Sequence, residues 1–136
     1  MVQDERKAKT QSGWDVTPEA FYDVIKWVND TYHPKSIIVT ENGCGSNDWL
    51  VNGHVDDANR CAFLEQYLIN LHRAIQDGIP VDGYFVWSLF DNFELSQGLT
   101  IRFGLVYIDY ETLERTPKRS AYWFSDVIRN NRIIIQ

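Results

Sequence analysis

The sequence has only two cysteines among its 136 residues, and what it lacks excludes several classes of protein. Cys44 and Cys61 are too few for a disulfide scaffold, and no C-x-x-C pair or Cys/His cluster has metal-ligand spacing. We therefore expect no metal site. No Gly-rich turn of the G-x-G-x-x-G or G-x-x-x-x-G-K-[ST] type occurs, so the phosphate cradle of nucleotide-binding folds is missing and no cofactor is expected.

Positive charge and long apolar runs are also scarce. The 13 basic and 19 acidic residues give a net charge of −6, which disfavours binding to nucleic acid or to an anionic membrane. No apolar stretch approaches the roughly 20 residues that span a bilayer, so no membrane segment is expected. The polar first residues lack the apolar core of a signal peptide, which predicts a cytoplasmic protein if Met1 is the true start and leaves the location unknown otherwise.

Hydrophobic periodicity is present and predicts an α-β-α-β-α chain. We expect helices over 18–32, over 57–77 and from 117 onward, and strands over 36–40 and 81–89. Thr17-Pro18-Glu19 and Thr116-Pro117 each offer a hydroxyl cap followed by a proline, a signal for a helix start. The β-branched run 36–40 lacks polar alternation, as expected of a strand buried on both faces of a parallel sheet. Segment 104–109 fits one arm of a hairpin.

Long loops leave both predicted strands, whereas short turns enter them. Residues 41–54 follow the first strand and residues 91–110 follow the second. This asymmetry indicates an α/β barrel or a doubly wound sheet, in which sites form at the carboxyl ends of parallel strands. An average sheet has about five or six strands, so the missing ones come either from another chain or from the rest of a larger domain.

Two acidic residues follow these strands. Glu41 stands where the first strand gives way to a glycine-rich loop, a position from which a carboxylate can face a pocket; the alternative is a structural acid paired with a base. Glu94 ends an aromatic segment that begins at Trp87, and rings with carboxylates suit a carbohydrate. The alternative there is a packed aromatic corner in which Asp91 and Asn92 form a turn.

At these segments the sequence resembles a known family. Ile38-Val39-Thr40-Glu41-Asn42-Gly43 is similar to the [IV]-T-E-N-G signature of glycoside hydrolase family 1, the β-glucosidase family, and 86–94 is similar to its W-S-L-x-D-N-F-E-W segment. Further matches, in order and spacing, cover 13–19, 77–80, 102–110 and 115–118. The resemblance implies the C-terminal third of a (β/α)8 TIM barrel with strands seven and eight. Residues 1–136 would then be the C-terminal segment of a single glycosidase barrel domain, not an independent domain.

The resemblance also implies roles for individual residues. Glu41 resembles the nucleophile of a retaining β-glycosidase, Trp87 the ring under the sugar, and Glu94 a carboxylate that takes sugar hydroxyls. Phe103 would line the same pocket. The family's N-E-P motif with the acid/base glutamate does not occur here. The implied activity, hydrolysis of O-glycosidic bonds, is therefore expected only when the rest of the barrel completes the site, and the chain alone is expected to be inactive. The implied partners are a β-glucoside or related carbohydrate and the remainder of the barrel, on the same or a separate chain.

Two positions depart from the family's pattern. Leu95 stands where the family has a tryptophan that donates its indole N–H to the sugar, and Leu99 stands where an aromatic residue is usual. The sugar pocket is therefore expected to be more apolar than in the family. These leucines favour the alternative function, a non-catalytic sugar-binding or protein-interaction relative of the family. Glu41 in its intact T-E-N-G context favours the enzyme.

Overall fold

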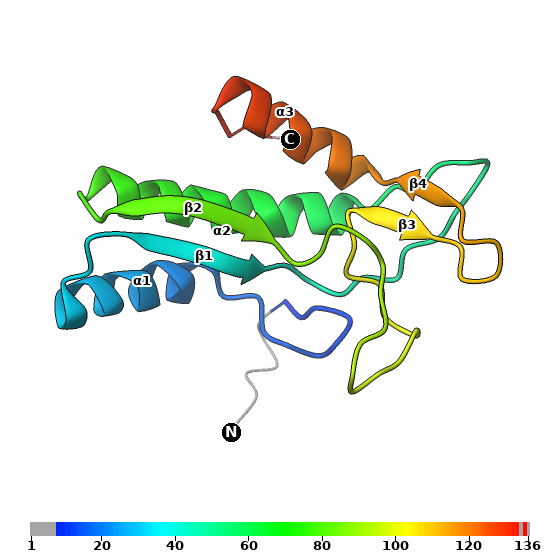
Figure 1. Ribbon diagram of the computed structural model, residues 1–136, viewed down its shortest axis with the longest axis horizontal. Helices are drawn as coiled ribbons and strands as arrows, with labels where there is room; N and C mark the ends of the chain where they lie inside the picture. The colour runs from blue at the N-terminus through cyan, green and yellow to red at the C-terminus, as the bar shows by residue number, and fades with distance from the viewer. Residues whose placement is uncertain (1–7, 134, 136) are drawn as a thin grey trace.

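The computed structural model describes residues 8–133 and 135 and follows the predicted alternation of helices and strands (Figure 1). In chain order the elements are α1 (Pro18–Tyr32), β1 (Ile37–Asn42), α2 (Ala58–Gln76), β2 (Val81–Val86), β3 (Val106–Ile108), β4 (Arg115–Pro117) and α3 (Arg119–Asn130). The predicted hairpin arm is β3, and the predicted second strand ends three residues early, at Val86. None of the described helices is long and apolar enough to cross a membrane.

β1 and β2 form a parallel pair in which Ile37 lies opposite Val81 and Asn42 lies opposite Val86. Their arrows point the same way in Figure 1, and the loops that leave them extend toward the same end of the molecule. The long loops after the two strands are therefore neighbours in space. In α/β barrels, active sites form at this end of the strands.

The predicted helix start at Thr116-Pro117 is wrong. These residues belong to β4, which pairs antiparallel with β3, and α3 begins only after Lys118. The pairing continues past the strand, because the Lys118 N–H donates to the carbonyl of Leu105 at 2.9 Å. A proline is tolerated in such a short strand at the sheet edge, where its missing N–H breaks no ladder. The Thr-Pro pair fits both a helix start and an edge strand, and pairing with β3 decides between them.

The hydrophobic core lies between the three helices and one face of the β1–β2 pair. Tyr22 and Ile25 enter it from α1, Leu64 and Leu71 from α2, and Trp123 from α3. The side chains of the strands that pack against this core are Ile37, Val39, Val81, Tyr84 and Val86. The helices thus cover the strands from one side.

The opposite face of the β1–β2 pair has no cover among the described residues. Ile38 in β1 is 53% exposed and Phe85 in β2 is 61% exposed, and Trp87, directly after β2, is 39% exposed. The expectation of strands buried on both faces is therefore met on one face only. All three helices that the structure describes pack on the same side, and no described element covers the other face.

We expect the isolated chain to self-associate rather than to remain a compact monomer. The apolar side chains of Ile38 and Phe85 stand on an open face, and the outer edges of the two strands lack partners in the described sheet. Sedimentation velocity at several concentrations should detect species larger than the 15.9 kDa chain. Phe85→Lys should reduce this association, whereas Tyr122→Lys on α3, at a site 64% exposed, should not. A compact monomer with sharp near-ultraviolet dichroism would contradict the prediction.

Candidate active site

The carboxyl ends of β1 and β2 border a cavity of about 480 Å³ that all four predicted site residues line. Glu41 is the penultimate residue of β1, and Trp87 follows the last residue of β2. Glu94 and Phe103 come from the long loop between β2 and β3. The fold therefore brings the four residues to one cavity, at the edge where the parallel strands end.

The last two residues of the T-E-N-G motif hold Trp87 beside Glu41. The carbonyl of Asn42 accepts the N–H of Trp87 at 2.9 Å, and its side-chain oxygen accepts the hydroxyl of Tyr84 at 2.7 Å. Burial raises the pKa of Tyr84, so this hydroxyl stays protonated and donates. A Cβ on Gly43 would lie 1.8 Å from the carbonyl oxygen of Trp87, so only glycine allows the two segments to approach this closely.

Glu94 begins a tight turn that borders the cavity. Its N–H donates to the carbonyl of Gly98 at 2.9 Å, and the Gly98 N–H donates back at 2.6 Å. The next residue, Leu95, is 92% exposed, and Leu99 is 47% exposed. Neither leucine lines the cavity that Glu94 lines. The expected effect of these two residues on a sugar pocket stays a prediction.

Phe103 is buried and forms part of the cavity wall. A Cβ on Gly45 would come within 3.2 Å of its ring, and the ring of Trp14 lies 6.4 Å from it, centroid to centroid. The carbonyl of Phe103 accepts the N–H of Ser88 at 3.2 Å, which ties it to the start of the same loop.

The structure adds five residues to this wall for which the sequence analysis assigned no role: Thr10, Trp14, Asp15, Phe63 and Tyr67. Trp14 and Asp15 lie in segment 13–19, one of the segments that resemble the family's motifs. A ring next to a carboxylate is the same combination that singled out the segment ending at Glu94. This combination is the sequence signal from which Trp14 and Asp15 could have been predicted as site residues.

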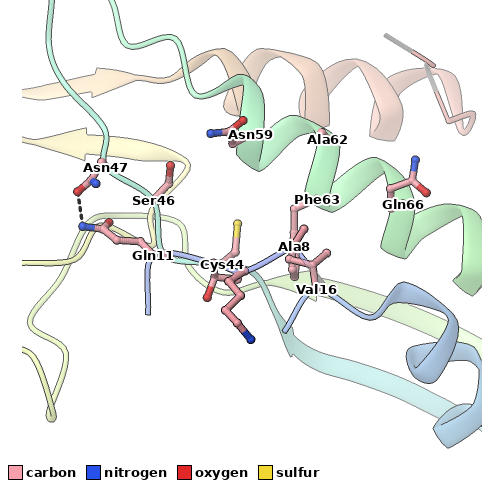
Figure 2. Close-up of a pocket in the computed structure, with 13 residues that line it drawn as sticks. Ala8, Gln11, Val16, Cys44, Ser46, Asn47, Asn59, Ala62, Phe63 and Gln66 are labelled. Atoms are coloured by element: carbon pink, nitrogen blue, oxygen red, sulfur yellow. Dashed lines mark hydrogen bonds between the residues drawn. The ribbon is translucent and has the colours of Figure 1, made fainter. Parts of the chain in front are cut away.

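A second cavity, of about 540 Å³, lies next to the first and shares Thr10 and Phe63 with it. Figure 2 shows Cys44 in its lining together with four side-chain amides, two of which, Gln11 and Asn47, are hydrogen-bonded. Burial raises the pKa of the Cys44 thiol to about 11, so the sulfur is protonated at neutral pH. This lining contains no carboxylate and none of the predicted site residues.

A cluster of buried charges joins the loops that carry the site. The Arg60 guanidinium lies 2.8 Å from Asp48 and 2.5 Å from Asp57, and the Lys118 ammonium lies 2.6 Å from both Asp48 and Asp91. Burial opposes the charge of Arg60, but Asp48 and Asp57 more than offset this and raise its pKa. The carboxylates in this cluster face cations, and no group of His, Cys, Asp and Glu in the described ranges could hold a metal ion.

The sequence matches the family model described as glycosyl hydrolase family 1 over residues 1–133. It is 48% identical to a 1,4-beta-D-glucan glucohydrolase of Thermotoga neapolitana and 45% identical to beta-glucosidase A of Thermotoga maritima, each over 124 residues. Both matches cover 90% of this chain and 28% of the relative. The chain thus spans little more than a quarter of the length of these relatives.

The fold matches solved structures of the same family. A family 1 β-glucosidase from Thermotoga maritima superposes with a TM-score of 0.95 at 42% identity, covering 98% of this chain and 30% of that chain. Structures of β-glucosidase from Thermotoga maritima in complex with castanospermine and with noeuromycin give the same TM-score. These β-glucosidases are TIM barrels, and this chain reproduces part of one. The chain belongs to glycosyl hydrolase family 1.

Proposed function

We propose that this chain supplies the nucleophile and part of the sugar site of a retaining β-glycosidase of the β-glucosidase type. The observation that carries the proposal is that Glu41, Trp87, Glu94 and Phe103 line one cavity at the carboxyl ends of two parallel strands. Active sites of (β/α)8 barrels form at this end of the strands. The relatives are named as β-glucosidases, which supports a β-glucoside or a related carbohydrate as substrate.

The chemistry of a retaining glycosidase assigns the residues distinct roles. An ionised carboxylate attacks the anomeric carbon, and a protonated one about 5–5.5 Å away protonates the leaving oxygen. Glu41 takes the first role. The ring of Trp87 packs against the C–H face of the sugar, and Glu94 accepts hydrogen bonds from its hydroxyls.

The acid/base group comes from the remainder of the barrel, because no Asn-Glu-Pro occurs in this sequence. In this proposal β1 and β2 are strands seven and eight, and residues 1–136 are the C-terminal segment of one barrel domain. The open face that carries Ile38 and Phe85 is where the inner side chains of the other strands would pack. The other strands belong either to the same polypeptide or to a separate one. In both cases residues 1–136 by themselves are inactive.

A chimaera tests the proposal. The chain replaces the matching segment of beta-glucosidase A from Thermotoga maritima, to which it is 45% identical over 124 residues. We expect the chimaera to hydrolyse an aryl β-glucoside. A 2-fluoroglucoside should label the peptide of the chimaera that contains Glu41. The isolated chain should show neither hydrolysis nor labelling. Binding of castanospermine, which is seen in complex with β-glucosidase from Thermotoga maritima, tests whether the sugar site is formed, independently of catalysis. A folded chimaera that binds castanospermine but is neither active nor labelled would instead support a non-catalytic sugar-binding relative.

Gly43→Ala should lower kcat/KM of the chimaera by about 10²-fold, the loss typical when a binding group moves by about 1 Å. The added Cβ would lie 1.8 Å from the carbonyl oxygen of Trp87, so the backbones of residues 43 and 87 must move apart. The control is Gly53→Ala, where φ is +77° but no atom lies within 4 Å of the new Cβ. It introduces backbone strain at a turn farther along the same loop, outside the cavity lining, and should leave kcat/KM within about threefold. Equal losses in the two variants would contradict the role of Gly43.

A further inference from the structure

We propose that Asp91 is a positioning residue for the sugar-binding side of the cavity, where its carboxylate holds the segment that carries Glu94 against the segment that carries Phe103. The inference rests on the proposed function, which assigns sugar contacts to Glu94 and a place in the wall of the sugar pocket to Phe103. By sequence alone, Asp91 could be interpreted as a turn former. Its side chain is fully buried.

The Asp91 carboxylate contacts both neighbours of Phe103. Its Oδ1 accepts the N–H of Gly104 at 2.9 Å, and its Oδ2 accepts Nη1 of Arg102 at 2.7 Å. Asp91 itself precedes Glu94 by three residues. A single carboxylate therefore connects the two parts of the loop that line the cavity, the part with Glu94 and the part with Phe103.

Backbone hydrogen bonds lay these two parts side by side. The Ser88 N–H donates to Phe103, the Leu105 N–H donates back to the carbonyl of Ser88 at 2.9 Å, and the Asp91 N–H donates to Val106 at 3.0 Å. A Cβ on Gly104 would lie 2.2 Å from the Asp91 nitrogen, so the segments are as close as glycine permits. Any displacement of Asp91 is therefore transmitted directly to Phe103.

Two cations fix the orientation of the carboxylate. The Lys118 ammonium contacts Oδ1 at 2.6 Å and also holds Asp48, in the loop after β1. The guanidinium of Arg102 lies over the rings of Tyr107 and Tyr110, at 3.9 and 4.5 Å from their centroids, so it cannot rotate freely toward another partner. Charge-assisted hydrogen bonds of this kind are stronger and more directional than neutral ones.

Glu41 lies outside this network, because Asp91 has no hydrogen bond or ion pair to β1 among the described contacts. Loss of the Asp91 charge should therefore disturb sugar binding more than the covalent step at Glu41. Asp91→Asn is the suitable change, because it keeps the shape and an oxygen for the Gly104 N–H while it removes the charge that faces Arg102 and Lys118.

The experiment measures kcat and KM of the chimaera for an aryl β-glucoside. We expect Asp91→Asn to raise KM about tenfold while kcat changes less than about threefold. In a Glu94→Gln background the same substitution should change KM less than about twofold, because residues that act as a unit give non-additive effects. The control is Asp109→Asn, the same chemical change in a turn where the carboxylate accepts the N–H groups of Glu111 and Thr112; it should leave KM unchanged.

Several results would overturn the inference. If Asp91→Asn lowers the unfolding midpoint but leaves KM unchanged, Asp91 is only structural. If its effect on KM is as large with Glu94→Gln as without it, Asp91 does not act through Glu94. If Asp91→Asn does not fold, the double variant Asp91→Asn with Lys118→Met is measured instead, because it restores equal numbers of buried acids and cations. This double variant should show the raised KM. If it also fails to fold, the inference is overturned. An unmodified chimaera that folds but neither hydrolyses nor binds sugar contradicts the proposed function itself.

Discussion

Glu41→Gln in the chimaera lowers the hydrolysis of an aryl β-glucoside by on the order of 10⁴–10⁶-fold, as expected when a covalent nucleophile is removed. The amide has the shape of the carboxylate but cannot attack the anomeric carbon. The side chain of Glu41 is exposed at the cavity, so its replacement removes no core contact and the fold should persist. Initial rates measure the loss, and castanospermine binding shows whether the cavity is intact.

A chemical rescue distinguishes a lost nucleophile from a distorted site. In Glu41→Gly, azide can enter the vacated space, attack the anomeric carbon and displace the aryl alcohol, so that activity returns and a glucosyl azide forms. Glu19→Gln on α1 is the matched control, because Glu19 is an exposed acid that does not line the cavity. Retention of more than about a tenth of the activity in Glu41→Gln would show that Glu41 is not the nucleophile.

Lys118→Met destabilises the chimaera by about 3–5 kcal/mol, the usual cost of removing one partner from a buried ion pair. The Lys118 side chain is fully buried, and burial together with the nearby Arg60 lowers its pKa against the pull of Asp48 and Asp91. Without the ammonium, the cluster keeps three carboxylates, Asp48, Asp57 and Asp91, against Arg60 and Arg102. One buried negative charge then lacks a counterion.

Urea unfolding of the chimaera measures this loss, with Lys26→Met as the matched control. Lys26 pairs with Asp30 on the surface of α1, with side chains 51% and 53% exposed, and such pairs contribute no more than about 1 kcal/mol. A similar small effect for both variants would mean that the methionine packs well enough to replace the ion pair. The cluster would then stabilise the loops less than its burial indicates.

Local patterns in the sequence predicted most of the chain's regular structure. Pro18 begins α1, and the β-branched run after Ser36 forms β1. The four candidate site residues came from two strand ends and from motifs that resemble the family, and the structure gathers them at one cavity. These signals are readable because helix and strand periodicity, and the order of the motifs, act over short stretches of the chain.

The tertiary structure alone decided where the ambiguous and the polar segments go. Thr116-Pro117 forms β4 because β3 is available to pair with it, and the two strands are covered on one side because all three helices pack there. The cluster around Lys118 could not be predicted, since its contact with Asp48 joins residues 70 positions apart. An isolated Asp or Lys has no periodicity, and only folding determines whether it meets water or an opposite charge.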